Sequence, residues 1–505
     1  MTGLLNHKGA LFMAAMIIGP ANNSPGKCTF RWYLHDVSLT GKENRMKNTL
    51  KYMLLGLMVW LGMLVPAAAQ DKGTASAQQA TLTFGLNTRF RYEFQDGFNQ
   101  KYYGPNPPRG QSSDGFLLGR FRAGLDWYPT QKIHIALWGQ HSTCWGNALP
   151  DSAFYKGTLG TEHNPNKDYW ELYTTFIEFK NLMDTGIGLK AGRQILAYGD
   201  NRVFGPGQWG NSGRYIWDAV KVSWKHQRGF VDIFYGQNMM HEVHRFSLKH
   251  RHQFETLGMY AHYDIMKKPY ALFVEPMLFT KRDSHDNYSG EDKTLGDVST
   301  WYGGLRLAVN KLRGFDFDAT YLREEGSFSS DDQRAYGYHL LLAYTFPVRF
   351  TPRVSVEYSY ASGDNNPKDG TRRTFHSAFG ARDKMYGRMN LFHWMNLQDL
   401  QVNVEVKPKP WLYVKMEVHK FKLAERKDAW YLNQKTYRDP SGASGDNVGK
   451  ELDIIATIKL PHGNKLMAGF GHFRPDEFAE KQASSRHANW CFVQWEYTFQ
   501  HALIK

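Results

Sequence analysis

The feature that most constrains this fold is an alternation of apolar and polar side chains that returns, about ten residues at a time, between Ala80 and Phe499. In segment 82–94 the apolar positions are Leu82, Phe84, Leu86, Phe90, Tyr92 and Phe94, and between them stand Thr83, Gly85, Asn87, Arg89, Arg91 and Glu93. A period of two is that of a β-strand with one apolar and one polar face. The chain is therefore predicted to be all-β.

Two all-β folds place these faces differently. A soluble sandwich buries the apolar face, whereas a membrane barrel turns it to lipid and lines its lumen with the polar face. No run of about 20 apolar residues follows residue 70, which excludes a bundle of membrane helices. The mean hydropathy is −0.54, and the aromatic content of 15% suits the aromatic girdles of a barrel. The pattern favours the barrel, and the sandwich remains the alternative.

The strand-like segments continue to the end of the chain without a linker, so residues 70–505 are predicted to form one antiparallel transmembrane barrel of about 18 strands. Further alternating segments are 119–127, 412–418, 452–460 and 491–499. The last of these ends on Tyr497 and Phe499, as in the signal that barrel assembly machinery reads, although residues 500–505 follow it. Short breaks at 128–131 and 346–347 are expected to be periplasmic turns. Longer polar stretches at 100–115, 146–168, 282–298 and 363–388 are expected to be extracellular loops or lumen inserts.

A secretory signal is visible inside the chain. Residues 46–51 are basic, 53–65 are apolar, and Ala67–Ala69 offer an A-x-A cleavage site. This order is that of a signal peptide, and the apolar run is too short to span a membrane. We therefore expect a mis-assigned start over residues 1–45, a signal peptide over 46–69, and a mature chain that begins near Gln70.

The formal net charge of +14 points to an acidic partner. Arg and Lys are scattered singly or in pairs through the strand-like segments, and no nucleic-acid motif is present. That distribution favours an acidic solute or lipid head groups over nucleic acid. Cys28 lies ahead of the predicted mature chain, and Cys144 and Cys491 could pair or remain free thiols.

Three spaced blocks resemble the bacterial alginate export family. They are residues 192–220, which begin Gly192-Arg193-Gln194 and include Tyr198-Gly199-Asp200-Asn201-Arg202; residues 361–397, which include Gly363-Asp364-Asn365; and residues 449–473. The resemblance implies an 18-stranded outer-membrane barrel that passes a polyanionic uronate polymer such as alginate along a lumen lined with Arg and Lys. It also implies outer-membrane lipid and periplasmic export proteins as partners.

Lumen arginines suit such a substrate because a planar guanidinium can bind a carboxylate at two points. The candidates are Arg89, Arg91, Arg120, Arg122, Arg193, Arg202 and Arg214, with Asp200 and Asp218 as partners. The competing interpretation is that each arginine forms a structural ion pair that braces the wall or holds a folded loop.

Other functions are less well supported by the sequence. A general or small-anion porin shares the fold and remains open, as does a barrel enzyme or adhesin, although no G-x-S-x-G, H-E-x-x-H or P-loop motif occurs. No cofactor is expected. Residues 364–370 resemble a Ca²⁺ loop in composition only, because the ligand spacing is incomplete. His244, His250 and His252 are expected to form a loop cluster and not a metal site.

Overall fold

The computed structural model describes residues 80–504 apart from 100–101, 105–111, 157–160, 163, 208, 214, 247, 249, 268–269 and 433–434. The predicted extension (1–45), the predicted signal peptide (46–69) and the predicted start near Gln70 lie outside the described residues. Contacts separate Met1–Ser76 from Ala77–Lys505, and the fold that follows is that of the second unit. Within the described residues, no helix is long and apolar enough to cross a bilayer.

Eighteen long antiparallel strands of the described residues form a closed barrel, which confirms the predicted fold class. They are β1 (Thr81–Asp96), β4 (Asp114–Thr130), β5 (Ile133–Trp145), β8 (Asp168–Leu182), β9 (Ile187–Ile195), β10 (Ile216–His226), β11 (Gly229–Met240), β12 (Arg251–Met266), β13 (Ala271–Ser289), β14 (Leu295–Leu312), β15 (Phe315–Phe328), β16 (Asp331–Thr345), β17 (Arg353–Ala361), β19 (Leu397–Lys409), β20 (Leu412–Lys422), β23 (Asn447–Lys459), β24 (Asn464–Pro475) and β25 (Ala488–Ile504).

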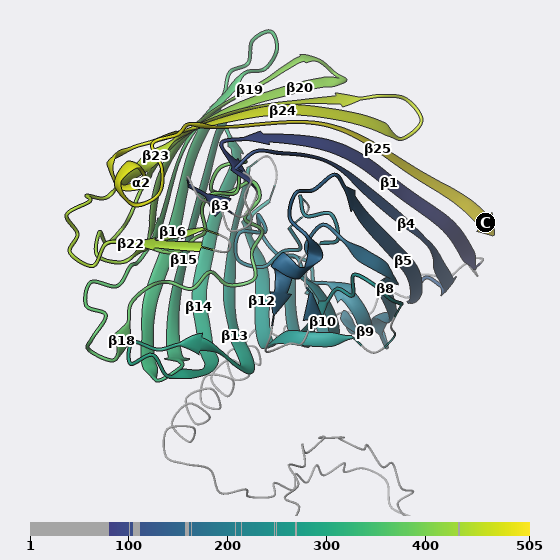
Figure 1. Cartoon of the computed structure of the whole chain (residues 1–505). Helices are drawn as coiled ribbons and strands as arrows, with labels where there is room; N and C mark the ends of the chain where they lie inside the picture. Colours follow the sequence, from purple (N-terminus) through teal and green to yellow (C-terminus); the bar gives the residue numbers. More distant parts are fainter. Residues whose placement is uncertain are drawn as a thin grey trace, which may run out of the picture. The chain divides into compact units, whose positions relative to one another are not determined.

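The barrel closes where its first and last strands pair. β1 pairs with β4 on one side and with β25 on the other, so the purple first strand and the yellow last strand of the barrel lie side by side (Figure 1). The tail that follows Phe499 continues β25, and Ala502 pairs with Thr83. Every long strand thus has two neighbours, and the sheet has no open edge along them.

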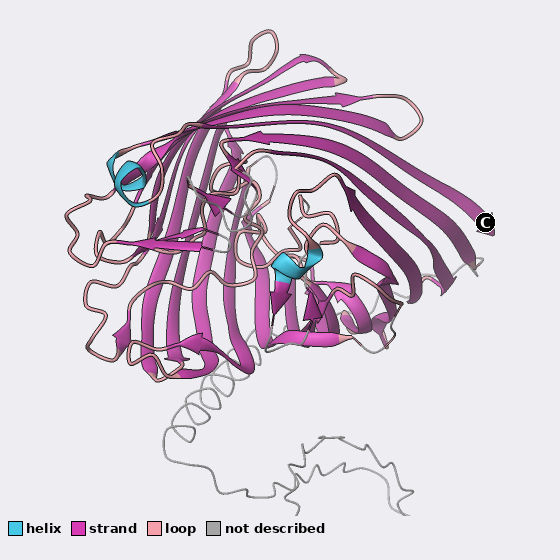
Figure 2. Ribbon diagram, viewed as in Figure 1, coloured by secondary structure: helices cyan, strands magenta, loops and turns pink. Residues whose placement is uncertain are grey.

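Smaller elements lie between the barrel strands. β18 (Thr371–Arg372) adds a short parallel pairing to β16, and separate hairpins are β2–β3 (Phe98–Asn99, Tyr102–Tyr103), β6–β7 (Tyr155–Lys156, Thr161–Glu162) and β21–β22 (Ala429–Leu432, Lys435–Arg438). Figure 2 shows how little helix accompanies the strands, namely η1 (Asp151–Phe154) and α2 (Glu477–Gln482).

The predicted faces are confirmed along β1. Arg91 is 0% exposed and points inward, whereas its neighbours Phe90 and Tyr92 are 43% and 51% exposed on the outer surface. The structure also leaves Cys144 buried and Cys491 exposed, both as free thiols.

The two ends of the barrel differ in their connections. At one end, which we call the turn end, strands are joined by short segments such as 131–132, 227–228 and 313–314, and β1 begins there and β25 ends there. At the other, the loop end, the connections include 97–113, 146–167, 196–215, 362–396 and 423–446. The predicted turn at 346–347 falls at the turn end. The one predicted at 128–131 is displaced, because β4 continues to Thr130 and only residues 131–132 form the turn.

One predicted loop is wrong. Residues 282–298 were expected to leave the sheet, but β13 continues to Ser289 and β14 starts at Leu295, so only 290–294 connect them. The alternation fades there because both faces of these strand ends are polar, and a bulge between Asp283 and Tyr288 shifts the register. Loss of the period therefore did not mean loss of the strand.

Candidate functional site

Two loop-end connections fold into the barrel and pair with each other. The loop of residues 196–215 and the loop of residues 362–396 together are called the lumen plug. The amide of Gly205 donates to the carbonyl of Phe379 at 3.0 Å, and the amide of Phe379 donates to that of Val203 at 3.0 Å. The two loops lie so close together at Gly380 that a Cβ atom on this residue would be 1.7 Å from the carbonyl oxygen of Arg202. Only glycine fits there.

Aromatic rings hold the lumen plug against the wall. Phe204 and Phe379 are in contact, with ring centroids 5.0 Å apart. Phe379 also meets Trp217 of β10 at 4.9 Å, and Phe204 meets Phe234 of β11 at 5.2 Å. All four rings belong to one buried cluster. The polar lumen face of the barrel therefore carries an apolar core of its own where the loops cover it.

The first pair of predicted lumen arginines contacts the plug. Arg89 Nη2 donates to Asn211 Oδ1 at 3.1 Å and to the carbonyl of Gly210 at 3.2 Å. Arg91 donates to the carbonyl of Trp209 at 2.9 Å, its guanidinium lies 3.7 Å from the centre of the Trp209 ring, and it pairs with Glu93 at 2.7 Å. Both guanidiniums are buried, so in this structure they fasten residues 209–211 to β1.

Arg120 and Arg122 extend this basic patch on β4, where Arg120 stands directly opposite Arg89. Arg120 donates to Asn87 Oδ1 at 3.0 Å. Arg122 donates to Gln140 Oε1 at 2.6 Å and lies 3.8 Å from the centre of the Tyr173 ring. The four arginines of β1 and β4 are thus brought together, and of these contacts only that of Arg91 with Glu93 is to an acid.

Arg193 and Arg202 are both paired with acids. Arg193 binds Asp218 at two points, 2.8 and 2.9 Å, and His252 contacts the same carboxylate at 2.9 Å. Arg202, from the plug, pairs with Asp200 at 3.2 Å and reaches Ser359 of β17 at 3.3 Å. Burial opposes ionisation of Asp200, but the charge of Arg202 outweighs it and lowers the pKa of Asp200. That these arginines bind a substrate and that they form structural ion pairs both stay predictions. Arg214 lies outside the described residues.

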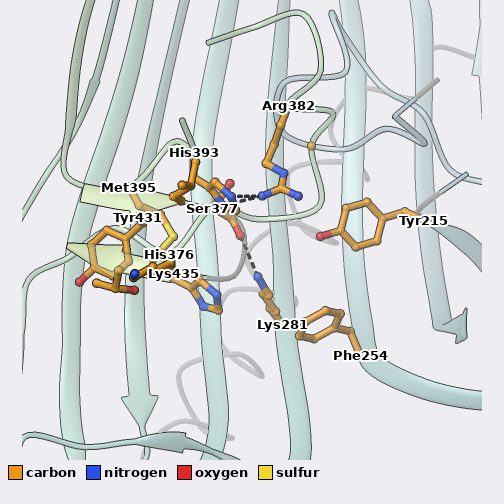
Figure 3. A pocket seen from close by; sticks show the side chains of 13 residues that line it. Tyr215, Phe254, Lys281, His376, Ser377, Arg382, His393, Met395, Tyr431 and Lys435 are labelled. Carbon is orange, nitrogen blue, oxygen red and sulfur yellow. Dashed lines mark hydrogen bonds between the residues drawn. The ribbon is translucent and has the colours of Figure 1, made fainter. Parts of the chain in front are cut away.

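A pocket of about 410 Å³ lies where the plug, β13 and the β21–β22 hairpin meet (Figure 3). Its lining carries the ammonium groups of Lys281 and Lys435, the guanidinium of Arg382 and the imidazoles of His376 and His393. None of the described residues that line it is acidic. We call it the cationic pocket.

Hydrogen bonds and ring contacts position the cations of the pocket. Lys281 Nζ donates to the carbonyl of Ser377 at 2.7 Å and lies 4.9 Å from the centre of the Phe254 ring. Arg382 contacts His393 Nδ1 at 2.6 Å. Tyr215 points its hydroxyl toward the same space (Figure 3). These contacts fix the positions of the Lys281 and Arg382 charges in the pocket.

The sequence did not indicate the cationic pocket. Because Lys281 and Arg282 are adjacent in the sequence, the charge pattern did not indicate which of the two points into the lumen. The strand register places Lys281 on the inner face. Arg382 and Lys435 come from two loops far apart in the sequence. No short-range signal could have joined them.

The segment 364–370, which resembles a calcium loop in composition only, is held by an arginine. Arg373 pairs with Asp369 at 2.9 Å and with Asp364 at 3.7 Å. Among the described residues, clusters with the spacing of metal ligands lie elsewhere, at Asp151, Glu162 and His244 and at Asp168, Glu171 and His241. That no cofactor is bound stays a prediction.

The second of these clusters is a buried charge network on the loop-end wall. His241, which directly follows β11, donates through Nε2 to the carbonyl of Gly213 at 2.6 Å, and its Nδ1 contacts Glu171 at 2.7 Å and Asp168 at 3.7 Å. Burial disfavours the imidazolium, but Glu171 and the other acceptors outweigh it and raise the pKa of His241 to about 9. His244 is exposed and touches Glu162 at 2.5 Å.

This network predicts a pH dependence of stability. Because the folded pKa of His241 is raised above its unfolded value, the stabilisation is complete below about pH 6.5 and is lost as the pH rises through about 9. In His241→Gln, the loss of thermal stability between pH 6 and pH 9.5 should be smaller than in the unaltered protein, as measured by the melting temperature in detergent. His244→Gln is the matched control and should keep the original profile. Identical profiles for the unaltered protein and His241→Gln would contradict the assignment.

Comparisons with known proteins agree with this geometry. The family model described as "Alginate export" matches residues 80–492. No curated protein matches the chain. Among solved structures, Pseudomonas aeruginosa OccK9 (OpdG) aligns with a TM-score of 0.56 at 11% identity, over 84% of this chain and 98% of OccK9. Pseudomonas aeruginosa OccD3 (OpdP) aligns with a TM-score of 0.54 at 11% identity, over 86% of this chain and 95% of OccD3. The structure titled Pseudomonas aeruginosa OpdK with vanillate aligns with a TM-score of 0.52 at 10% identity, over 83% of this chain and 99% of OpdK.

At these identities the solved structures show the fold, and the match of the family model over most of the chain shows the family. The turn end is then the periplasmic end and the loop end the extracellular one, as in other barrels of the outer membrane. The chain belongs to the alginate export family and is an integral β-barrel protein of the outer membrane, with the fold of a channel.

Proposed function

We propose that this outer-membrane channel passes an anionic polysaccharide, with alginate or a related polyuronate as the substrate class, and that the cationic pocket binds its carboxylates. The observation that carries the proposal is the lining of that pocket, which holds Lys281, Arg382 and Lys435 and no acidic side chain among its described residues. Barrel assembly machinery and periplasmic export proteins are the partners that this proposal requires.

The chemistry of the pocket suits a carboxylated sugar. A guanidinium can bind a carboxylate at two points, and an ammonium acts as a point charge that accepts several geometries. Arg382 and Lys435 are only half-buried, so each supplies a site of moderate strength. Moderate sites in series let an anion enter and leave, whereas one strong site would trap it.

A small-anion porin is the second candidate. The lumen plug occupies part of the barrel interior, and 410 Å³ is within the range of pockets that bind small molecules. The structure of OpdK, which shares the fold, was solved with vanillate. In this interpretation the same cations would select a single carboxylate and not a polymer.

Block of the channel current separates the two candidates. The protein is reconstituted in planar bilayers, and oligouronates of increasing length are added, with neutral oligosaccharides of equal length as the control. A polymer channel predicts that block strengthens with each added uronate, because more carboxylates contact cations at once. Equal block by a monouronate and by longer chains would favour the small-anion porin, and equal block by neutral sugars would contradict both.

A further inference from the structure

A row of three cations crosses the outer surface of the barrel at its loop end. Lys420 of β20 is directly opposite Lys450 of β23, which is directly opposite Arg474 of β24. All three side chains are exposed, whereas Glu451 and Phe473, which alternate with them, are buried inside. Adjacent strands are about 4.8 Å apart, so the row spans roughly 10 Å. We call Lys420, Lys450 and Arg474 the outer basic row.

The outer basic row lies at the edge of the lipid-facing surface. Toward the middle of the barrel, the next outward positions on the same strands are Val418, Leu452 and His472. The row after them is fully apolar, and its members Met416, Ile454 and Phe470 are 38–41% exposed. Toward the outside, β20 ends at Lys422, β24 ends at Pro475, and the loop-end connections begin. The row therefore stands where the apolar belt ends and the head groups of the outer leaflet begin.

Other outward cations near the loop end have acidic partners on the protein. Arg323 pairs with Glu325 at 3.0 Å, Arg334 with Asp332 at 3.5 Å and Arg282 with Glu255 at 3.6 Å.

In the outer basic row, the nearest paired acid is Asp476, 3.9 Å from Lys450. Within the described part of the chain, no ion pair joins Lys420 or Arg474 to an acid. Like charges directly opposite each other destabilise a sheet, so this row calls for an anion from outside the chain.

We infer that the outer basic row is a binding site for the phosphates of an outer-leaflet lipid, and specifically for a glycolipid that carries two phosphates. Two phosphates on one lipid can contact three cations spread over about 10 Å, while the acyl chains lie along the apolar belt below. The guanidinium of Arg474 binds a phosphate at two points, and the two lysines add point charges. The site is on the outside of the barrel and does not depend on what passes through the lumen.

The test compares two triple variants of the full protein with matched charge loss. Lys420→Gln, Lys450→Gln, Arg474→Gln removes the row. Arg349→Gln, Lys409→Gln, Lys459→Gln removes two lysines and one arginine that are exposed at the turn end. Binding of bisphosphorylated lipid A to the protein in detergent is measured by native mass spectrometry, with the dephosphorylated lipid as the control ligand.

The outer-row triple variant is expected to bind bisphosphorylated lipid A at least tenfold more weakly, and the turn-end triple variant is expected to bind it normally. An equal loss in both triple variants, no loss in either, or binding of the dephosphorylated lipid to the unaltered protein as tight as that of the bisphosphorylated lipid would overturn the inference. Displacement of the lipid by inorganic phosphate at similar concentration would also overturn it, because the site would then be a simple anion site. If the triple variant does not fold, Arg474→Gln alone should give a smaller loss in the same direction, and Arg474→Lys should restore part of it.

Discussion

The double variant Arg382→Gln, Lys435→Gln is expected to weaken block of the channel by oligouronates by at least about 100-fold, because it removes two contacts of a carboxylate with a partly desolvated cation and each contributes about 1.5–3 kcal/mol. Both side chains are half-buried and lie outside the barrel strands, Lys435 in the small β21–β22 hairpin, so the barrel should fold unchanged. The blocking concentration is read from single-channel traces at fixed salt.

The control for this variant removes the same charge from the lipid-facing surface. Lys420→Gln, Lys450→Gln should leave the blocking concentration as it is, since these side chains face away from the lumen. If the two double variants weakened block equally, the effect would come from net charge and not from the pocket. If neither changed it, the pocket would not be where the polymer binds.

Phe379→Ala is expected to loosen the lumen plug and raise the conductance severalfold. Phe379 is 0% exposed and contacts Phe204 and Trp217 within the plug and its wall. Truncating a buried Phe costs about 3–5 kcal/mol of stability. Because Phe379 lies outside the barrel strands, we expect the truncation to weaken the pairing of the two plug loops and not the barrel wall. Single-channel conductance measures the opening, and hydrogen exchange at Gly205, whose amide bonds to Phe379, measures the loosening.

Phe470→Ala is the matched control for the plug variant. Its ring is 41% exposed on the outer surface, so its removal should leave both conductance and the exchange rate at Gly205 unchanged. An unaltered conductance in Phe379→Ala, together with faster exchange at Gly205, would show that the plug can loosen without widening the path for ions.

The wall of the barrel was predictable because its signal is local. Alternation along segment 82–94 fixed both the strand and its two faces, and Arg89 and Arg91 indeed point inward. A strand in lipid needs one apolar face whatever its neighbours are, so each segment could be assigned alone. At 282–298 the strands extend beyond the apolar belt, and this requirement no longer holds.

The contents of the lumen were not predictable in the same way. Phe204 and Phe379 follow no period, and their burial depends on a contact between loops 175 residues apart in the sequence. The inward arginines were found, but whether Arg193 meets Asp218 or a sugar depends on strand register and loop path. The family resemblance marked the blocks that build the plug without indicating that they fold against each other.

The proposed function is the passage of an anionic polymer through the channel. The most direct measurement is efflux from liposomes that contain the protein and are loaded with an oligouronate and a neutral oligosaccharide of equal length. We expect the oligouronate to leave faster, and we expect added salt to reduce this difference in rate by screening the cations. Equal efflux of the two sugars, or retention of both while small anions escape, would contradict it.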